Sequence, residues 1–72
     1  MYEVIYINDK TEQLYSFRFF TYLEAVKWVL NSFMDWQANA PAQLTKTEII
    51  ERLNKTNGIR LAYKYWCIEK LA

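Results

Sequence analysis

The closing stretch of the chain, YKYWCIEKLA (residues 63–72), contains the residue types most suited to a chemical role. Aromatic side chains alternate there with lysines, as on sheets that bind single-stranded nucleic acid, where rings stack on bases and basic groups hold phosphates. The nucleic-acid hypothesis requires one sheet face to present aromatic and basic side chains together. The residues that would form this face are Arg18, Arg60, Lys64, Trp66 and Lys70.

The charge distribution gives this hypothesis little support. The formal net charge is +1, and the chain from residue 41 onward holds six basic and three acidic side chains. Proteins that bind nucleic acid mainly through phosphates have denser basic surfaces. A half-buried strand shows the same alternation when lysine stems lie along apolar surface and their amines reach water. We therefore rank nucleic-acid binding as the alternative hypothesis.

The chain lacks a recognisable set of catalytic groups. It contains no histidine, two serines and one cysteine, so no nucleophile has an evident general base. Cys67 falls within a predicted strand, where an unpaired cysteine is typically a small buried hydrophobe. The usual zinc-binding sets cannot be assembled, and a single glycine excludes glycine-rich phosphate loops. We expect a protein that is not an enzyme and has no catalytic residues, metal, cofactor or small-molecule substrate.

Length and composition predict a single domain over residues 1–72. Apolar residues make up 53% of the chain and aromatic residues 18%, whereas disordered segments are poor in both. A chain of this size buries only roughly 60% of its surface on folding, so its margin of stability is narrow. One cysteine cannot form an internal disulfide, which leaves oligomerisation as the way to gain stability.

The sequence also predicts a cytoplasmic location. The lone thiol suits a reducing compartment, and the first ten residues carry an early acid and no basic segment of the signal-peptide type. No apolar run approaches the roughly 20 residues that a membrane-spanning helix needs, so no membrane association is expected. Residues encoded by AT-rich codons are abundant, which suggests a bacterial or phage origin.

Two segments rich in β-branched and aromatic residues, 2–7 and 14–20, predict a β-hairpin around a polar turn. A four-residue turn between them would place Glu3 opposite Arg18. One face of the hairpin would then form the core, and the other would carry apolar side chains beside this ion pair. The expected core residues are Tyr2, Val4, Tyr6, Tyr15, Phe17 and Phe19.

Two capping boxes predict two helices. Thr21 precedes Glu24 by three residues at the start of an apolar run of helical period, which predicts a helix over residues 22–38. The same pattern at residues 45–48 predicts a second helix. Gly58 is expected to end that helix by taking the left-handed conformation.

Strand-forming residues return from Ile59 to about Lys70 and predict a third strand. With two helices between the second and third strands, the order is ββααβ, and an αα-hairpin covers one face of a small antiparallel three-stranded sheet. The expected fold class is therefore α+β. The third strand can pair with the second or, running parallel, with the first.

More apolar surface is predicted than one short αα-hairpin can cover. Contiguous exposed apolar patches usually mark interaction sites, and tryptophan is a favoured anchor of interfaces. We therefore expect a protein-protein interaction module, first a homodimer, with a small adaptor or inhibitor of a larger protein as the related option. The predicted interface residues are Ile5, Ile7, Leu14, Trp28, Trp36, Trp66 and Ile68. For Trp28 and Trp36, packing inside the core is an equal alternative.

Overall fold

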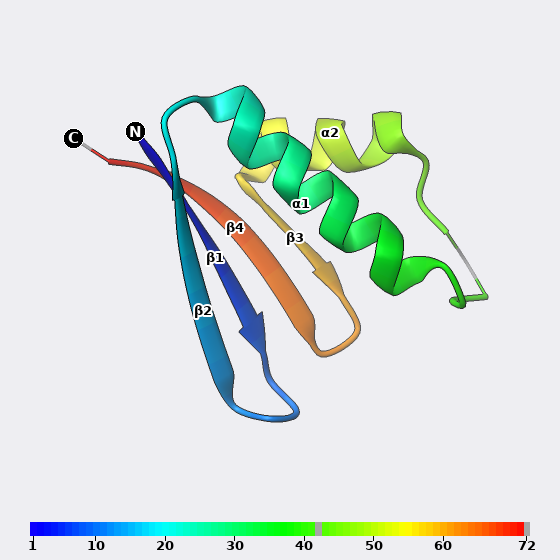
Figure 1. The fold of residues 1–72 in the computed structure, drawn as a ribbon. Helices are drawn as coiled ribbons and strands as arrows, with labels where there is room; N and C mark the ends of the chain where they lie inside the picture. The colour runs from blue at the N-terminus through cyan, green and yellow to red at the C-terminus, as the bar shows by residue number, and fades with distance from the viewer. Residues whose placement is uncertain (42, 72) are drawn as a thin grey trace.

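The computed structural model describes residues 1–41 and 43–71, which form a four-stranded antiparallel sheet with two helices on one face (Figure 1). The elements follow the chain in the order β1 Tyr2–Asn8, β2 Gln13–Phe19, α1 Tyr22–Gln37, α2 Lys46–Thr56, β3 Gly58–Leu61 and β4 Lys64–Lys70. Across the sheet the strand order is β2, β1, β4, β3. The predicted α+β class is confirmed, whereas the prediction of three strands is wrong by one strand.

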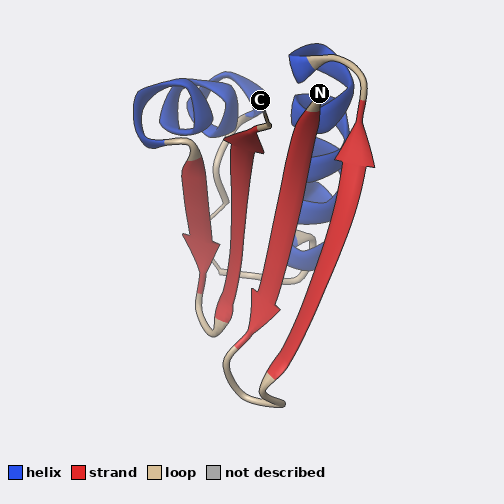
Figure 2. Ribbon diagram, turned by 90° about the vertical axis from the view of Figure 1, so that its left-hand side faces the viewer, coloured by secondary structure: helices blue, strands red, loops and turns tan. Residues whose placement is uncertain are grey.

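The sheet has one covered face and one open face. Figure 2 shows the open face, with α1 behind the strands. α1 packs on β1, β2 and β4, and α2 packs on β3 and α1. The core fills the space between the helices and the covered face. Its buried apolar residues are Val4, Ala25, Val26, Val29, Phe33, Ile49, Leu53, Ile59, Trp66 and Ile68.

The β1–β2 hairpin has the predicted register. Glu3 lies opposite Arg18 and Asn8 opposite Gln13, so the polar turn between the strands has four residues. The side chain of Asn8 holds this turn, because its Oδ1 accepts the N–H groups of Lys10 and Thr11 at 3.1 and 3.2 Å. Side-chain capture of nearby N–H groups is the usual reason for asparagine at a turn.

Both predicted helix starts are confirmed, but only the second forms the full capping box. At α1, Thr21 Oγ1 accepts the N–H of Glu24 at 3.2 Å. At α2, Thr45 Oγ1 accepts the N–H of Glu48 at 3.2 Å, and Glu48 Oε1 accepts the N–H of Thr45 at 3.0 Å. These bonds satisfy amide groups that have no partner inside the helix.

The residue that ends α2 was predicted wrongly. Asn57, with φ of 59°, takes the left-handed conformation, and its N–H donates to Leu53 O at 2.8 Å. Asparagine tolerates this conformation better than most residues. Gly58 is needed for a different reason: a Cβ added there would collide with the Tyr65 hydroxyl and lie 2.8 Å from Tyr65 Cζ.

The segment predicted as one third strand is a second hairpin. A two-residue turn at Ala62 and Tyr63 divides it into β3 and β4, and Ala62 has a φ of 53°. Neither residue is typical of such turns, which usually contain glycine or asparagine, so this hairpin could not be predicted from its turn residues. β4 pairs antiparallel with β1, so neither predicted pairing is right: the turn at Ala62 and Tyr63 reverses the chain, and the strand that joins β1 runs antiparallel to it.

Trp66 lies at the centre of the core. It is fully buried, and its ring centroid lies 5.2 Å from that of Tyr6 and 5.4 Å from that of Phe33. The indole N–H donates to Ser32 Oγ at 3.0 Å. A buried indole requires such a partner, so this hydrogen bond fixes how α1 sits on the sheet.

Candidate protein-binding surface

The open face of the sheet carries an apolar strip. The register places Ile5 between Ser16 and Cys67, and Ile7 between Leu14 and Tyr65. Leu14 is 64% exposed, while both isoleucines are half-buried. The predicted placement of Ile5, Ile7 and Leu14 on one uncovered face therefore agrees with the structure.

Two ion pairs border this strip. Arg18 Nε lies 3.4 Å from Glu3 Oε2, and Arg60 Nη1 lies 2.8 Å from Asp9 Oδ2. Exposed pairs of this kind contribute only about 0–1 kcal/mol to stability. Their larger effect is to hold the arginine side chains at the rim, which leaves the apolar centre uncovered.

The backbone of β2 forms one free edge of the sheet. Asp9 N–H donates to Tyr63 O at 2.8 Å, and Leu71 N–H donates to Met1 O at 2.9 Å, so the odd-numbered residues along β1 bond to β4. Antiparallel ladders alternate, and the even-numbered residues of β1 therefore bond to β2. The residues of β2 whose N–H and C=O groups point away from β1 are Leu14, Ser16 and Arg18.

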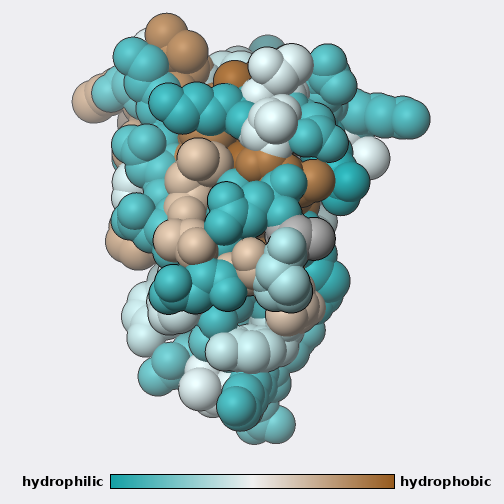
Figure 3. Space-filling view, turned by 90° about the vertical axis from the view of Figure 1, so that its right-hand side faces the viewer, coloured by the Kyte–Doolittle hydropathy of each residue, from teal (hydrophilic) through white to brown (hydrophobic). Residues whose placement is uncertain are grey.

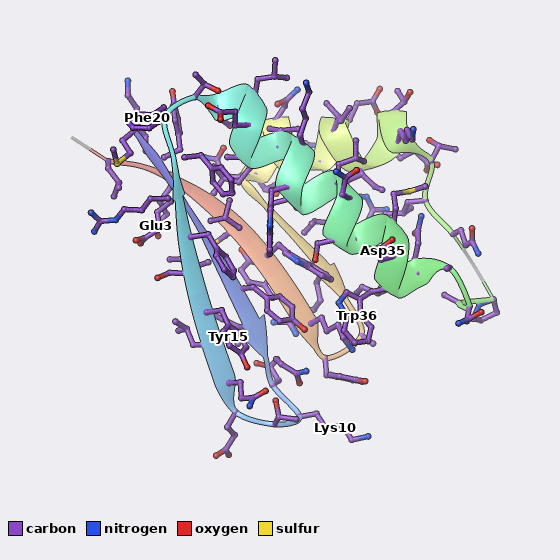
Figure 4. The ribbon with its side chains drawn as sticks, viewed as in Figure 1. Glu3, Lys10, Tyr15, Phe20, Asp35 and Trp36 are labelled. Atoms are coloured by element: carbon purple, nitrogen blue, oxygen red, sulfur yellow. The ribbon has the colours of Figure 1, made fainter. Side chains whose placement is uncertain are left out.

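Aromatic side chains lie along the same edge on the other face. Tyr15 and Phe17 were predicted to be core residues, but they are 45% and 39% exposed. Because β2 is the outermost strand, α1 covers it only in part, with Trp28 at 4.7 Å from Phe17 between ring centroids. Tyr15 stacks on Tyr6 at 6.1 Å. Figure 4 shows Tyr15 beside β2, away from both helices.

We call residues Leu14–Arg18 the β2 surface. It combines an unpaired backbone edge with Leu14 on the open face and with Tyr15 and Phe17 on the covered face. All five residues are exposed. Sequence analysis identified only Leu14 among the three apolar residues, because alternation in a strand does not show how far a helix extends over it.

Trp66 and Ile68 were placed wrongly on the open face. They are 0% and 3% exposed beneath the helices, so neither can contact a partner of the folded protein. Alternation along β4 separated the two sets of side chains correctly but could not show which set faces the helices. The pairing of Ile5 with Cys67 decides this, since it places Cys67 on the open face and Trp66 on the covered face.

The two remaining tryptophans have different positions. Trp28 is half-buried against Phe17 and Phe19, so it belongs mainly to the packing of α1 on β2. Trp36 is 54% exposed at the end of α1. Its ring lies 4.0 Å from Lys64 Nζ, which also lies 3.7 Å from the centre of the Tyr63 ring.

Lys64 is thus held between two aromatic rings, and it is only 5% exposed. Such cation–π contacts gain strength when the ammonium is shielded from water. The hydrogen bond from Lys64 and its positive charge lower the pKa of the Tyr63 hydroxyl. Figure 4 shows Trp36 reaching from α1 toward the β3–β4 turn, so this contact joins the two elements.

The residues proposed for nucleic acid do not share a face, and that part of the prediction is wrong. Arg18 and Arg60 are on the open face, where each is held in an ion pair. The covered side of β4 carries the other three residues, Lys64, Trp66 and Lys70. Trp66 is buried and cannot stack on a base, because its ring already packs inside the core.

A different group of basic residues comes together between α2 and β3. Arg52, Lys55 and Arg60 line a hollow of about 320 Å³ with Tyr65 in its wall, and the Arg60 guanidinium lies 5.3 Å from the centre of that ring. Arg52 and Lys55 both belong to α2, and sequence analysis did not join Arg60 to them, because α2 and β3 are separate elements that the fold brings together.

Cys67 is half-buried on the open face. Burial raises the pKa of its thiol, and the nearby carboxylates of Glu69 and Glu3 raise it further. The thiol is therefore protonated at neutral pH, and a protonated thiol is a poor nucleophile.

The described residues contain no group of three histidine, cysteine, aspartate or glutamate side chains placed to hold a metal ion. In the same part of the chain, neither helix has the length and apolar character that crossing a membrane requires. Comparison with protein-family models, curated proteins and solved structures gave no match.

Proposed function

We propose that this protein functions by binding protein, and that its first partner is a second copy of itself at the β2 surface. The observation that carries the proposal is a seven-residue edge strand with an unpaired backbone edge and with exposed apolar side chains on both faces. Unpaired strand edges readily pair with another strand, and natural proteins usually protect long ones. β2 has no proline, no bulge in its pairing and one charged residue, Arg18.

The helical side offers a weaker surface for such a partner. Figure 3 shows that side as mostly hydrophilic, with hydrophobic atoms visible between polar ones. A small domain gains most from burying its apolar surface, at roughly 25 cal/mol per Å². A two-fold homodimer supplies that burial without a second gene product, and two-fold dimers are the commonest oligomers.

A larger protein is the related partner class. Its own edge strand could add to β2 in the same way, as in other complexes formed by strand addition. An adaptor or inhibitor role would follow from that mode of binding. Self-association and strand addition compete for the same edge, so a stable homodimer would exclude a second occupant.

The test is solution molar mass by light scattering across a concentration series. We expect wild-type protein to approach twice its chain mass of 8.7 kDa as concentration rises. Leu14→Lys should shift this transition to higher concentration, because it places a charge on the β2 surface. Leu23→Lys is the matched control, since Leu23 is 62% exposed on α1 and does not belong to the β2 surface.

The outcomes separate clearly. A wild-type monomer throughout the series overturns the homodimer. A dimer that Leu14→Lys and Leu23→Lys weaken equally removes the β2 surface from the interface. Thermal unfolding of both variants shows whether the monomer fold is kept.

Anion binding is the second candidate, and the hollow lined by Arg52, Lys55 and Arg60 supports it. Convergent basic groups hold phosphates in a salt-dependent way. Arg52→Glu combined with Lys55→Glu should abolish binding of a mixed-sequence oligonucleotide measured by fluorescence anisotropy. Lys27→Glu combined with Lys46→Glu makes the same charge change elsewhere and is the control; equal loss in both double variants would leave the hollow without a specific role.

A further inference from the structure

The geometry points to one particular arrangement of the dimer: β2 pairs antiparallel with β2 of the second copy, about a two-fold axis at Ser16. The inference rests on the proposed self-association and specifies how it is built. Each sheet has four strands, so the pairing forms one continuous eight-stranded sheet. The β2 surface then becomes the centre of the assembly.

The backbone selects this register. The residues that point outward are Leu14, Ser16 and Arg18, and an antiparallel ladder must pair such residues with one another. With the axis at Ser16, each Ser16 faces the other, and each Leu14 faces the partner's Arg18. All three residues bond, giving six N–H to C=O hydrogen bonds between the two copies.

Neighbouring registers leave outward groups unpaired. An axis at Tyr15 pairs Leu14 with Ser16 of the second copy, but Arg18 then faces Glu12, which lies in the turn with φ of 56° and outside β2. An axis at Phe17 leaves Leu14 beyond the end of the partner strand. Because only the axis at Ser16 pairs every outward residue, it makes the most hydrogen bonds.

The side chains fit the same register. On the covered face, Tyr15 of one copy lies opposite Phe17 of the other, so the Tyr6–Tyr15 and Phe17–Trp28 ring pairs of the two copies join. Cross-strand aromatic pairs stabilise sheets by about 0.2–1 kcal/mol each. On the open face, two small serines meet at the axis, and the arginines lie at opposite ends of the contact.

Charge placement supports the pairing as well. The aliphatic stem of Arg18 can lie along the partner's Leu14 while its guanidinium keeps its bond to Glu3. Arg18 is also the only charged residue in β2, so no like charges face each other across the axis. The contact is therefore self-complementary in backbone, shape and charge.

Disulfide trapping tests the register directly. In a Cys67→Ser background, Ser16→Cys places two thiols opposite each other, where paired residues have Cα atoms about 5.5 Å apart, within the span of a disulfide. With diamide as the oxidant, two thiols lose two protons and two electrons to form the bond. We expect this variant to form covalent dimer at least about tenfold faster than Leu14→Cys alone, whose thiols would lie far beyond the roughly 7 Å limit.

A mixture supplies the second arm of the experiment. Leu14→Cys and Arg18→Cys proteins, mixed, should cross-link to each other faster than either does alone. Fastest linkage between Leu14→Cys and Ser16→Cys would instead place the axis at Tyr15 and overturn the inference. A dimer of full molar mass in which Ser16→Cys links no faster than Leu14→Cys also overturns it and leaves self-association intact, whereas a monomer overturns both.

Discussion

The two edges of the sheet differ in length and in protection. β2 has seven residues, and its outward groups face open space. β3 has four residues, follows directly on α2, and holds Arg60 in an ion pair with Asp9. Short edge strands with charged residues resist pairing with other chains. One sheet therefore protects one of its edges and leaves the other available, and this difference is the main reason to place a partner at β2.

The β3–β4 turn and the β1–β2 turn also differ, in whether a helix holds them. The β3–β4 turn is tied to α1 through Lys64, which lies between Trp36 and Tyr63. The β1–β2 hairpin instead reaches beyond both helices (Figures 1 and 2). The polar residues of its turn are exposed, and the turn is held by its own asparagine and by contacts of Asp9 with Arg60 and Tyr63 rather than by a helix. Packing against the helices thus fixes the β3 side more firmly than the β2 side.

Trp66→Ala should have the largest effect on the free energy of unfolding, because Trp66 lies at the centre of the core on which both edge strands depend. Trp66 is fully buried and bonded to Ser32, and truncating such a residue costs about 3–5 kcal/mol of unfolding free energy. Urea unfolding followed by circular dichroism measures this loss. Trp36→Ala is the control, since that ring is 54% exposed and should cost less.

If Trp66→Ala does not fold, Trp66→Phe keeps the experiment informative with a smaller loss. A folded Trp66→Ala protein of unchanged stability and lowered molar mass would instead return Trp66 to an interface. That result would contradict the burial of Trp66 beneath the helices. Equal losses for Trp66→Ala and Trp36→Ala would show that burial beneath the helices does not set the cost.

Features set by local chemistry could be predicted from the sequence. The β1–β2 register follows from alternation and turn length, and both helix starts follow from a threonine that can accept an amide three residues later. These signals act within a few residues, so the surrounding fold cannot easily override them. The apolar strip at Ile5, Ile7 and Leu14 could be predicted because it belongs to that hairpin.

Features set by tertiary pairing could not be predicted. The turn at Ala62 and Tyr63 lacks the usual turn residues, so it was missed, and with it the short protected edge. The burial of Trp66 depends on which face of β4 meets the helices, which the pairing with β1 decides. Likewise, the exposure of Tyr15 and Phe17 depends on the edge position of β2, which no local pattern encodes.

Proline substitution at equivalent edge positions compares the two edges directly. Ser16 and Arg60 both point their N–H groups away from the neighbouring strand, so proline removes no ladder bond at either site. Ser16→Pro should raise the dimer dissociation constant by roughly 100-fold, because two central hydrogen bonds between the copies are lost. Arg60→Pro should leave it unchanged. Sedimentation equilibrium measures both constants, and equal weakening would show that the edges do not differ.

Substitution of Gly58 tests how closely β3 packs against the Tyr65 ring of β4. A Cβ at this position collides with the Tyr65 ring, which Arg60 also covers, so Gly58→Ala should cost about 1–3 kcal/mol of unfolding free energy. The cost should fall in a Tyr65→Ala background, where the colliding ring is absent. A double-mutant cycle by urea unfolding measures this coupling. Additive costs of the two substitutions would mean that the Tyr65 ring does not resist a Cβ at position 58. The β3 side would then not be closed by this contact.

Protonation of Glu48 should weaken the β3 side slightly. The backbone and side-chain hydrogen bonds of Thr45 lower the pKa of Glu48 in the folded protein, so its contribution to stability is present above the unfolded pKa and is lost as pH falls through the folded value. Glu48 starts α2, and α2 leads directly into β3. Glu48→Gln should therefore lower the melting temperature at pH 7, and the gap from wild type should close as pH falls through the folded pKa of Glu48.

Hydrogen exchange locates this acid effect along the chain. Amide protection in α2 and β3 should fall in Glu48→Gln at pH 7, while β1 and β2 keep theirs, because their hairpin is joined by its own ladder. Glu51→Gln alters an exposed carboxylate of the same helix outside the capping box and is the control. An equal fall in all four strands would mean that the sheet opens as one unit. The two edges would then differ only in what can bind to them, and not in how firmly each is held.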